Sequence, residues 1–276
     1  MAGHDFEAFK HSIETTFMRH PVVTQNAYTE WFARGAMTPA HLRHFTVQFS
    51  VFSSQFLLAA LNRVINANSL EAAREAKEIL MNELGVIYNK GGASTPTATV
   101  ADADREGDPT LVSVEGSVDG GRFRFQAAHL EWILHFGESL GLTFNDISKR
   151  RLGTPSTLFF CDELFRLYGS DDYNEAMGAA FAVENWAAAG FWKQLIAGLE
   201  TVKRTQVPNM PLAFFTWHDR IEDLHKAHVW DELRACYHSD AFSEEPFIDA
   251  GMRMLDGVKM FWDGLLAVAE ERRPAA

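Results

Sequence analysis

The sequence has few cysteines, no long apolar run and no excess of positive charge. Its two cysteines, Cys161 and Cys236, lie far apart and form no Cys-x-x-Cys motif, which excludes a thiolate zinc site or a vicinal redox pair. We expect both to be free, buried thiols. No uncharged apolar stretch of about 18 residues could cross a membrane, and the first residues lack the basic start and apolar core of a signal peptide. We therefore expect a cytoplasmic protein.

The charge balance of the chain is acidic. It has 25 Lys and Arg residues against 37 Asp and Glu residues, a formal net charge of −12. Nucleic acids and anionic membranes are bound through basic surfaces, so neither is an expected partner. A small-molecule substrate is expected instead. With 276 residues, of which 47% are hydrophobic, the whole chain 1–276 can form a single domain around one core.

Helix signals follow one another with short breaks. Thr38-Pro39 and Thr154-Pro155 each place an N-cap residue before a proline at the first helical position, and Ser69 caps another apolar run. No alternating strand series or fixed repeat is present, so the predicted class is all-α. The pattern predicts about seven helices, over residues 39–57, 70–88, 123–140, 155–168, 172–202, 211–237 and 246–270.

One segment, residues 89–121, breaks the helical pattern. It is rich in Gly, Ser, Thr, Pro and Asp, and its last part alternates polar and apolar residues around Val-Asp-Gly-Gly, which is compatible with a small β-hairpin. We interpret it as an insertion between two core helices. A disordered surface loop and a lid over a pocket are the alternatives.

The strongest local signal for chemistry lies between residues 218 and 225. His218, Glu222 and His225 stand at positions i, i+4 and i+7, so all three lie on one face of a helix. The preceding Phe-Phe-Thr-Trp sequence indicates that this part of the helix is buried. Buried charged groups are costly unless they are paired or coordinated, which favours a metal site over a solvated surface.

Three further polar residues interrupt apolar helix faces. Glu83 lies among Ile79, Leu80, Val86 and Ile87, and Glu184 has no basic residue at i±3 or i±4 to pair with it. His129 lies among aromatic residues, where a lone histidine is more often a core residue than a ligand. Each of the two carboxylates needs a partner from another helix.

The six residues together predict a two-metal centre. Three carboxylates and three imidazoles from four helices are difficult to satisfy mutually without cations, and two Fe(II) ions bring four positive charges against three negative ones. Carboxylate and imidazole ligands without thiolate suit iron, or manganese as the alternative. A ferritin-like centre would show two Glu-x-x-His motifs, whereas only Glu222-Asp-Leu-His225 fits here.

This ligand order resembles that of the haem-oxygenase-like di-iron oxidases, a branch of the TenA/PqqC-like helical fold. The resemblance covers nearly the whole chain. It includes His20-Pro21, the run from Trp31 to Leu42, Leu80-Met-Asn-Glu83, the segment from His129 to Gly141, Glu184 and the 218–225 motif. Two departures are visible: Glu222 stands where the family usually has aspartate, and residues 89–121 separate the first glutamate from the first histidine.

The resemblance implies an all-α, haem-oxygenase-like bundle and an oxidoreductase that uses dioxygen as co-substrate. Its metal ligands would be Glu83, His129, Glu184, His218, Glu222 and His225. The substrate would be an amino acid, an amine or a fatty acid derivative, of the kind used in natural-product biosynthesis. An electron donor and a second copy of the chain in a homodimer are the expected further partners.

Other residues receive weaker interpretations. Phe181, Phe191 and Phe215 are candidate pocket walls or ordinary core residues, and Arg122 or Arg124 could anchor a substrate carboxylate. The family's para-aminobenzoate-forming members use a lysine near the position of Lys193, which we interpret here as a solvated residue. Two alternative functions remain: a metal-independent TenA- or PqqC-like enzyme, and a non-catalytic ligand-binding helical protein.

Overall fold

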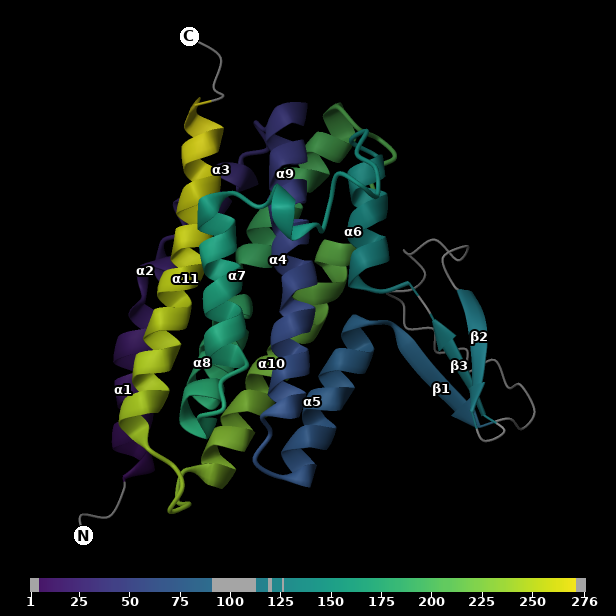
Figure 1. The fold of residues 1–276 in the computed structure, drawn as a ribbon. Helices are drawn as coiled ribbons and strands as arrows, with labels where there is room; N and C mark the ends of the chain where they lie inside the picture. The colour runs from purple at the N-terminus through teal and green to yellow at the C-terminus, as the bar shows by residue number, and fades with distance from the viewer. Residues whose placement is uncertain (1–4, 91–112, 119–120, 126, 272–276) are drawn as a thin grey trace.

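Helices make up almost all of the structure, a computed structural model that describes residues 5–90, 113–118, 121–125 and 127–271 (Figure 1). The side chains of residues 71, 75, 87–90, 113–118, 121–125 and 221–228 lie outside this description. The fold is an all-α bundle, as predicted. In chain order its elements are α1 (Phe6–Thr16), the 3-10 turn η1 (Phe17–Arg19), α2 (Pro21–Thr24), α3 (Ala27–Ala33), α4 (Pro39–Ile65), α5 (Leu70–Glu83), β1 (Val86–Lys90), β2 (Ser113–Val118), β3 (Gly121–Phe125), α6 (His129–Glu138), the 3-10 turn η3 (Arg150–Leu152), α7 (Pro155–Tyr168), α8 (Tyr173–Ala187), α9 (Phe191–Thr205), α10 (Ala213–Cys236) and α11 (Glu244–Glu271).

The helix starts that the sequence signals predicted are confirmed. The Thr38 hydroxyl accepts from the backbone N–H of His41 while the His41 imidazole accepts from the Thr38 N–H, so α4 begins with a reciprocal capping box. The Thr154 hydroxyl caps α7 in front of Pro155, and Ser69 caps α5. In each case a side chain satisfies a backbone N–H that has no partner within the helix.

Several helix ends differ from the prediction. The helix predicted over 70–88 ends at Glu83 because Gly85 adopts a left-handed conformation (φ +65°), and the chain continues into β1. The helix predicted over 123–140 starts only at His129, since residues 121–125 form β3. The predicted 172–202 helix is two helices, with Gly190 at φ +96° between α8 and α9.

The predicted number of helices was also too low. Eleven α-helices lie within the described part of the chain, where about seven were expected. Besides the division at Gly190, the additional helices are α1, α2 and α3, all before residue 34. They are short, from four to eleven residues. Such segments carry too few turns to show a helical period clearly, and packing against the rest of the bundle stabilises them.

A small antiparallel sheet lies beside the bundle, next to α5 (Figure 1). Its strand order is β1-β3-β2, and Val86 pairs with Phe125 at the bundle end of β1 and β3. The sheet joins the end of α5 to the start of α6. Much of the predicted insertion, residues 91–112 and 119–120, lies outside the described residues, so the interpretation of 89–121 as a loop or hairpin insertion stays a prediction.

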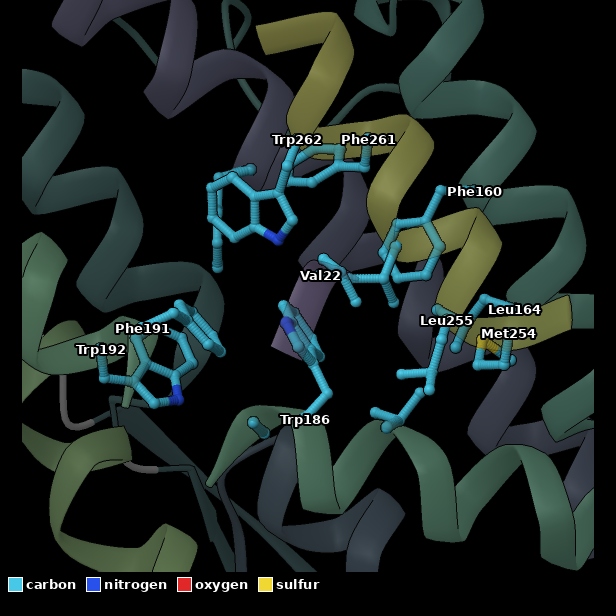
Figure 2. Packing of buried hydrophobic residues seen from close by; sticks show 14 of the residues in the cluster. Val22, Phe160, Leu164, Trp186, Phe191, Trp192, Met254, Leu255, Phe261 and Trp262 are labelled. Atoms are coloured by element: carbon cyan, nitrogen blue, oxygen red, sulfur yellow. The ribbon is translucent and has the colours of Figure 1, made fainter. Parts of the chain in front are cut away.

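Aromatic side chains fill the centre of the bundle. α11 packs mainly against α8 and α7, and Figure 2 shows Trp186 of α8 pointing between Trp262 of α11 and Phe191 of α9. Trp186 stacks on Phe191 with ring centroids 4.5 Å apart, and Phe191 lies 5.6 Å from Trp262. These rings hold the middle of α8 and the start of α9 in fixed positions, which matters because both helices contribute to the cavity described below.

Both cysteines are free, as predicted. Cys161 is buried, and burial raises the pKa of its thiol to about 12. Cys236 is only partly buried, and its thiol donates to the Leu233 carbonyl. In the described ranges, no helix is both long and apolar enough to cross a bilayer.

Helices α8 and α11 approach closely at Gly178. A methyl group built on Gly178 would lie 2.0 Å from the carbonyl oxygen of Phe247, which is a backbone atom and cannot rotate away. Gly137 in α6 is a matched contrast, because the nearest atoms to a methyl group there are side-chain carbons at 3.5 Å.

We expect Gly178→Ala to lower the free energy of unfolding by about 1–3 kcal/mol, since the two helices must separate. Gly137→Ala should leave it unchanged or raise it by up to about 1 kcal/mol through helix propensity. Urea unfolding followed by circular dichroism measures both. Equal stability of the two variants would show that α8 and α11 are not packed this closely.

Candidate functional site

A cavity of about 460 Å³ runs along the inside of the bundle, bounded mainly by α4, α5, α8 and α10. Its walls are mostly aromatic and aliphatic, and polar side chains lie at both ends. The residues that shape its walls include Phe49, Phe52, Phe56, Arg63, Glu83, His129, Tyr168, Glu184, Trp186, Phe191, Trp192, Phe214, Trp217, His218 and Glu232. The volume is in the range of sites for small organic molecules.

Glu83 and His129 form a direct pair in the cavity wall. The Glu83 Oε2 atom lies 2.5 Å from His129 Nδ1, and the two side chains are 14% and 11% exposed. Glu83 is the last residue of α5 and His129 the first of α6, so the short sheet between them brings the two helix ends together. At the other ring nitrogen, His129 Nε2 is buried and has no hydrogen-bond partner among the described residues.

His218 lies directly beside His129. Their ring centroids are 4.6 Å apart, and the His218 ring also stacks on Trp192 with a centroid distance of 4.5 Å. His218 Nδ1 lies 2.5 Å from the carbonyl oxygen of Phe214, one helical turn earlier. Because a carbonyl oxygen only accepts, Nδ1 carries the proton in this bond.

Glu184 enters the cavity from α8. Its neighbour Asn185 is buried, donates to the Phe181 carbonyl and accepts from the indole N–H of Trp230 on α10. The bond to Trp230 fixes the rotation of α8 against α10. The rotation places Glu184 in the cavity wall, while Asn185 lies between the two helices.

Four of the six predicted metal ligands thus line one cavity: Glu83, His129, Glu184 and His218, from α5, α6, α8 and α10. The side chains of Glu222 and His225 lie outside the described part of the structure. Within that part, no three His, Cys, Asp or Glu side chains converge as a metal-binding group. The complete ligand set therefore stays a prediction.

The four described residues nevertheless suit a divalent transition metal. They supply imidazole and carboxylate and no thiolate, which is the donor set preferred by iron and manganese. The bond from His218 Nδ1 to the Phe214 carbonyl is the kind of outer contact that orients a metal-binding histidine. The unpartnered Nε2 of His129 is the kind of buried polar atom that a bound ion would satisfy.

The other predicted residues are found in different settings. Phe191 lines the cavity, whereas Phe181 and Phe215 are buried core residues outside the set of lining residues. The side chains of Arg122 and Arg124 lie outside the description. Lys193 is exposed on α9, as its interpretation as a solvated residue predicted.

Sequence reasoning missed the polar group at the other end of the cavity. Arg63 of α4 lies 3.7 Å from the Glu232 carboxylate of α10, and its guanidinium lies 5.0 Å from the ring centroid of Tyr168. A signal was present: Arg63 continues the face of Phe49 and Phe56 at heptad spacing, and Glu232 stands two heptads after His218. A charged residue on such a face is as unusual as Glu83.

The phenol of Tyr168, which lines the cavity, has a raised pKa. Burial is the main cause that raises the pKa of its phenol well above the ordinary value. The nearby Arg63 lowers this pKa, while Glu184 and Glu83 raise it. The phenol therefore stays protonated at neutral pH.

Comparisons with known proteins identify the fold. No protein-family model and no curated protein sequence matches the chain. Among solved structures, a TenA homologue from Pseudomonas syringae pv. tomato is similar with a TM-score of 0.63 and 11% sequence identity, over 95% of this chain and 92% of that one. The chain therefore has a TenA-like helical fold; at this identity the likeness shows the fold and not the activity.

The contact between Glu83 and His129 can be tested as an energetic coupling. In a double-mutant cycle with Glu83→Ala and His129→Ala, we expect a coupling of about 1–3 kcal/mol in the free energy of unfolding, because each single variant leaves a buried partner unpaired. Urea unfolding in the presence of a chelator measures it. The matched cycle replaces Glu83→Ala by Glu78→Ala, an exposed glutamate of the same helix. Equal coupling in both cycles would contradict the pairing.

Proposed function

We propose that the chain is a non-haem di-iron oxidase or oxygenase that uses dioxygen to oxidise a small organic substrate. Its metal ligands are Glu83, His129, Glu184, His218, Glu222 and His225, and manganese is the alternative metal. The observation that supports this most directly is that Glu83, His129, Glu184 and His218, from four helices, all line one apolar-walled cavity. Carboxylates and imidazoles in such surroundings need a cation or each other.

Bound iron would supply the one-electron chemistry that activates dioxygen, which amino-acid side chains do not provide by themselves. The chain's own residues have three tasks. The carboxylates would balance the positive charge of the metal, and the imidazoles would hold it through a ring nitrogen. Trp192 and Phe214 hold the His218 ring, with centroids 4.5 Å away in both cases, and keep bulk water from it.

The cavity restricts the substrate to a small molecule. Its volume of about 460 Å³ holds an amino acid, an amine or a fatty acid derivative, and its aromatic walls favour an apolar body. In this proposal the whole chain 1–276 acts as one domain. A separate electron donor and a second copy of the chain are the proposed partners.

A metal-independent enzyme is the second candidate. It is favoured by the direct contact between Glu83 and His129, since a carboxylate that orients an imidazole forms an acid–base pair without any ion. A protein that only binds a ligand in the cavity is the third candidate. Iron binding and dioxygen uptake separate the first candidate from both others.

The iron proposal is tested by adding Fe(II) to metal-free protein without dioxygen and measuring the iron bound per chain. We expect about two iron ions per chain, and dioxygen uptake when dioxygen is admitted. Glu184→Ala and His218→Ala should each lose at least one ion and most of the uptake, because each removes a ligand.

Two matched variants serve as controls. Glu175→Ala changes a glutamate in the first turn of the same helix α8, whose carboxylate accepts from Ser170. His238→Ala changes an exposed histidine just after α10. Both should bind iron as the unchanged chain does. If the unchanged chain binds no iron, the oxidase proposal is wrong and the metal-independent reading gains support.

A further inference from the structure

The end of the cavity opposite the two imidazoles contains a guanidinium group with a hydrogen-bond donor that has no acceptor among the described residues. Arg63 is the single lysine or arginine among the residues that line the cavity in the described part of the chain. Its Nη1 atom is buried and has no hydrogen-bond partner among the described residues. A buried guanidinium nitrogen without an acceptor is costly, so an acceptor from outside the chain is expected there.

The contacts of Arg63 with Glu232 and Tyr168 leave its hydrogen-bond donors without an acceptor. Its other terminal nitrogen lies 3.7 Å from Glu232, which is a charge contact and too long for a hydrogen bond. Tyr168 offers the face of its ring, which attracts the cation but accepts no strong hydrogen bond. The guanidinium therefore keeps donors for a planar acceptor such as a carboxylate, which it can bind through two parallel bonds.

Arg63 and the imidazoles stand at opposite ends of the cavity. Phe49 contacts both Trp192 and Phe214, with centroid distances of 5.8 Å, and these two rings in turn contact His218. Arg63 follows Phe49 on the same helix by about four turns, which is roughly 21 Å along the axis. Phe52 and Phe56 line the cavity between them.

The two ends also differ in exposure. The Arg63 and Glu232 side chains are 19% and 29% exposed, whereas those of His129 and Glu83 are 11% and 14% exposed. Asn66 and Asn68, which follow α4, line the cavity near Arg63. The arginine end of the cavity is therefore the more solvent-exposed one. An amphipathic ligand would keep its charged group at this end and place its apolar part in the more buried end.

We infer that Arg63 is the anchor for the carboxylate of an elongated, apolar-bodied acid, whose far end lies next to His129 and His218. The acid binds with its carboxylate away from the imidazoles, so the position presented to them is remote from the carboxylate. As a statement about the substrate of the oxidase, this rests on the function proposed above. As a statement about binding, it applies equally to the metal-free chain.

Binding is tested on the full metal-free chain by calorimetric titration with octanoate and decanoate, and with octanol as the uncharged counterpart. We expect the acids to bind, and Arg63→Gln to weaken their binding by about 10- to 100-fold while leaving octanol binding unchanged. Arg63→Lys should restore part of the loss, because the charge is kept and the paired geometry is not. Arg166→Gln, which removes an exposed arginine of α7, is the control.

Glu232→Gln distinguishes an anchor from a structural role for Arg63. If Arg63 serves the ligand, removing the competing carboxylate should tighten octanoate binding by about 2- to 5-fold. If Arg63 serves only to hold α4 against α10, both Arg63→Gln and Glu232→Gln should weaken octanoate binding. Weaker binding in Glu232→Gln, equal binding of acid and alcohol, or no binding of either acid would each overturn the inference.

The orientation is measured with decanoate brominated either at its last carbon or next to the carboxylate, because bromine quenches nearby tryptophan fluorescence. Trp186, Trp192 and Trp217 line the cavity, and Trp192 stacks on His218. We expect the terminal bromine to quench more strongly, and Trp192→Phe to reduce the difference. Stronger quenching by the other isomer would overturn the orientation. Neither the calorimetric nor the fluorescence measurement uses iron. A failure of the oxidase proposal, seen as absent iron binding, is therefore distinguishable from a failure of the Arg63 inference.

Discussion

The cost of keeping charge inside an aromatic bundle is the constraint on which this structure depends. Glu83 and Glu184 lie in a cavity with aromatic walls, where a carboxylate is stable only next to a cation, a donor or a bound ion. The direct contact between Glu83 and His129 meets part of this requirement within the chain. Two metal ions bound in the cavity, as proposed above, would be a further source of positive charge for these carboxylates.

The aromatic core and the polar cavity depend on each other. Trp186, Phe191 and Trp192 belong to the core and also form the cavity wall, so the packing that stabilises the bundle also positions the His218 ring. The close approach of α8 and α11 at Gly178 and the hydrogen bond from Trp230 of α10 to Asn185 of α8 have the same double effect. Loss of packing at these points should therefore affect the cavity before the fold as a whole.

Much of the fold follows from local rules that the sequence displays. Thr38, Ser69 and Thr154 begin their helices because their hydroxyl groups satisfy backbone N–H groups, and this needs only neighbouring residues. The helix ends were harder to predict. Gly85 follows the end of α5 and Gly190 precedes the start of α9, both in left-handed conformations, but a glycine can also continue a helix, as Gly137 and Gly178 do. Which of these occurs depends on what the glycine contacts elsewhere in the bundle.

The sequence by itself determined that the chain is an all-α bundle with unusual charged residues on apolar helix faces, because helical period and side-chain polarity are local properties. It also singled out Glu83, His129, Glu184 and His218, which the structure brings to one cavity. Only the tertiary structure decided that Glu83 contacts His129 and that Arg63 lies at the opposite end of the same cavity. These relations join residues from different helices, so the distances and directions between them are set by how the helices pack and not by spacing along the chain.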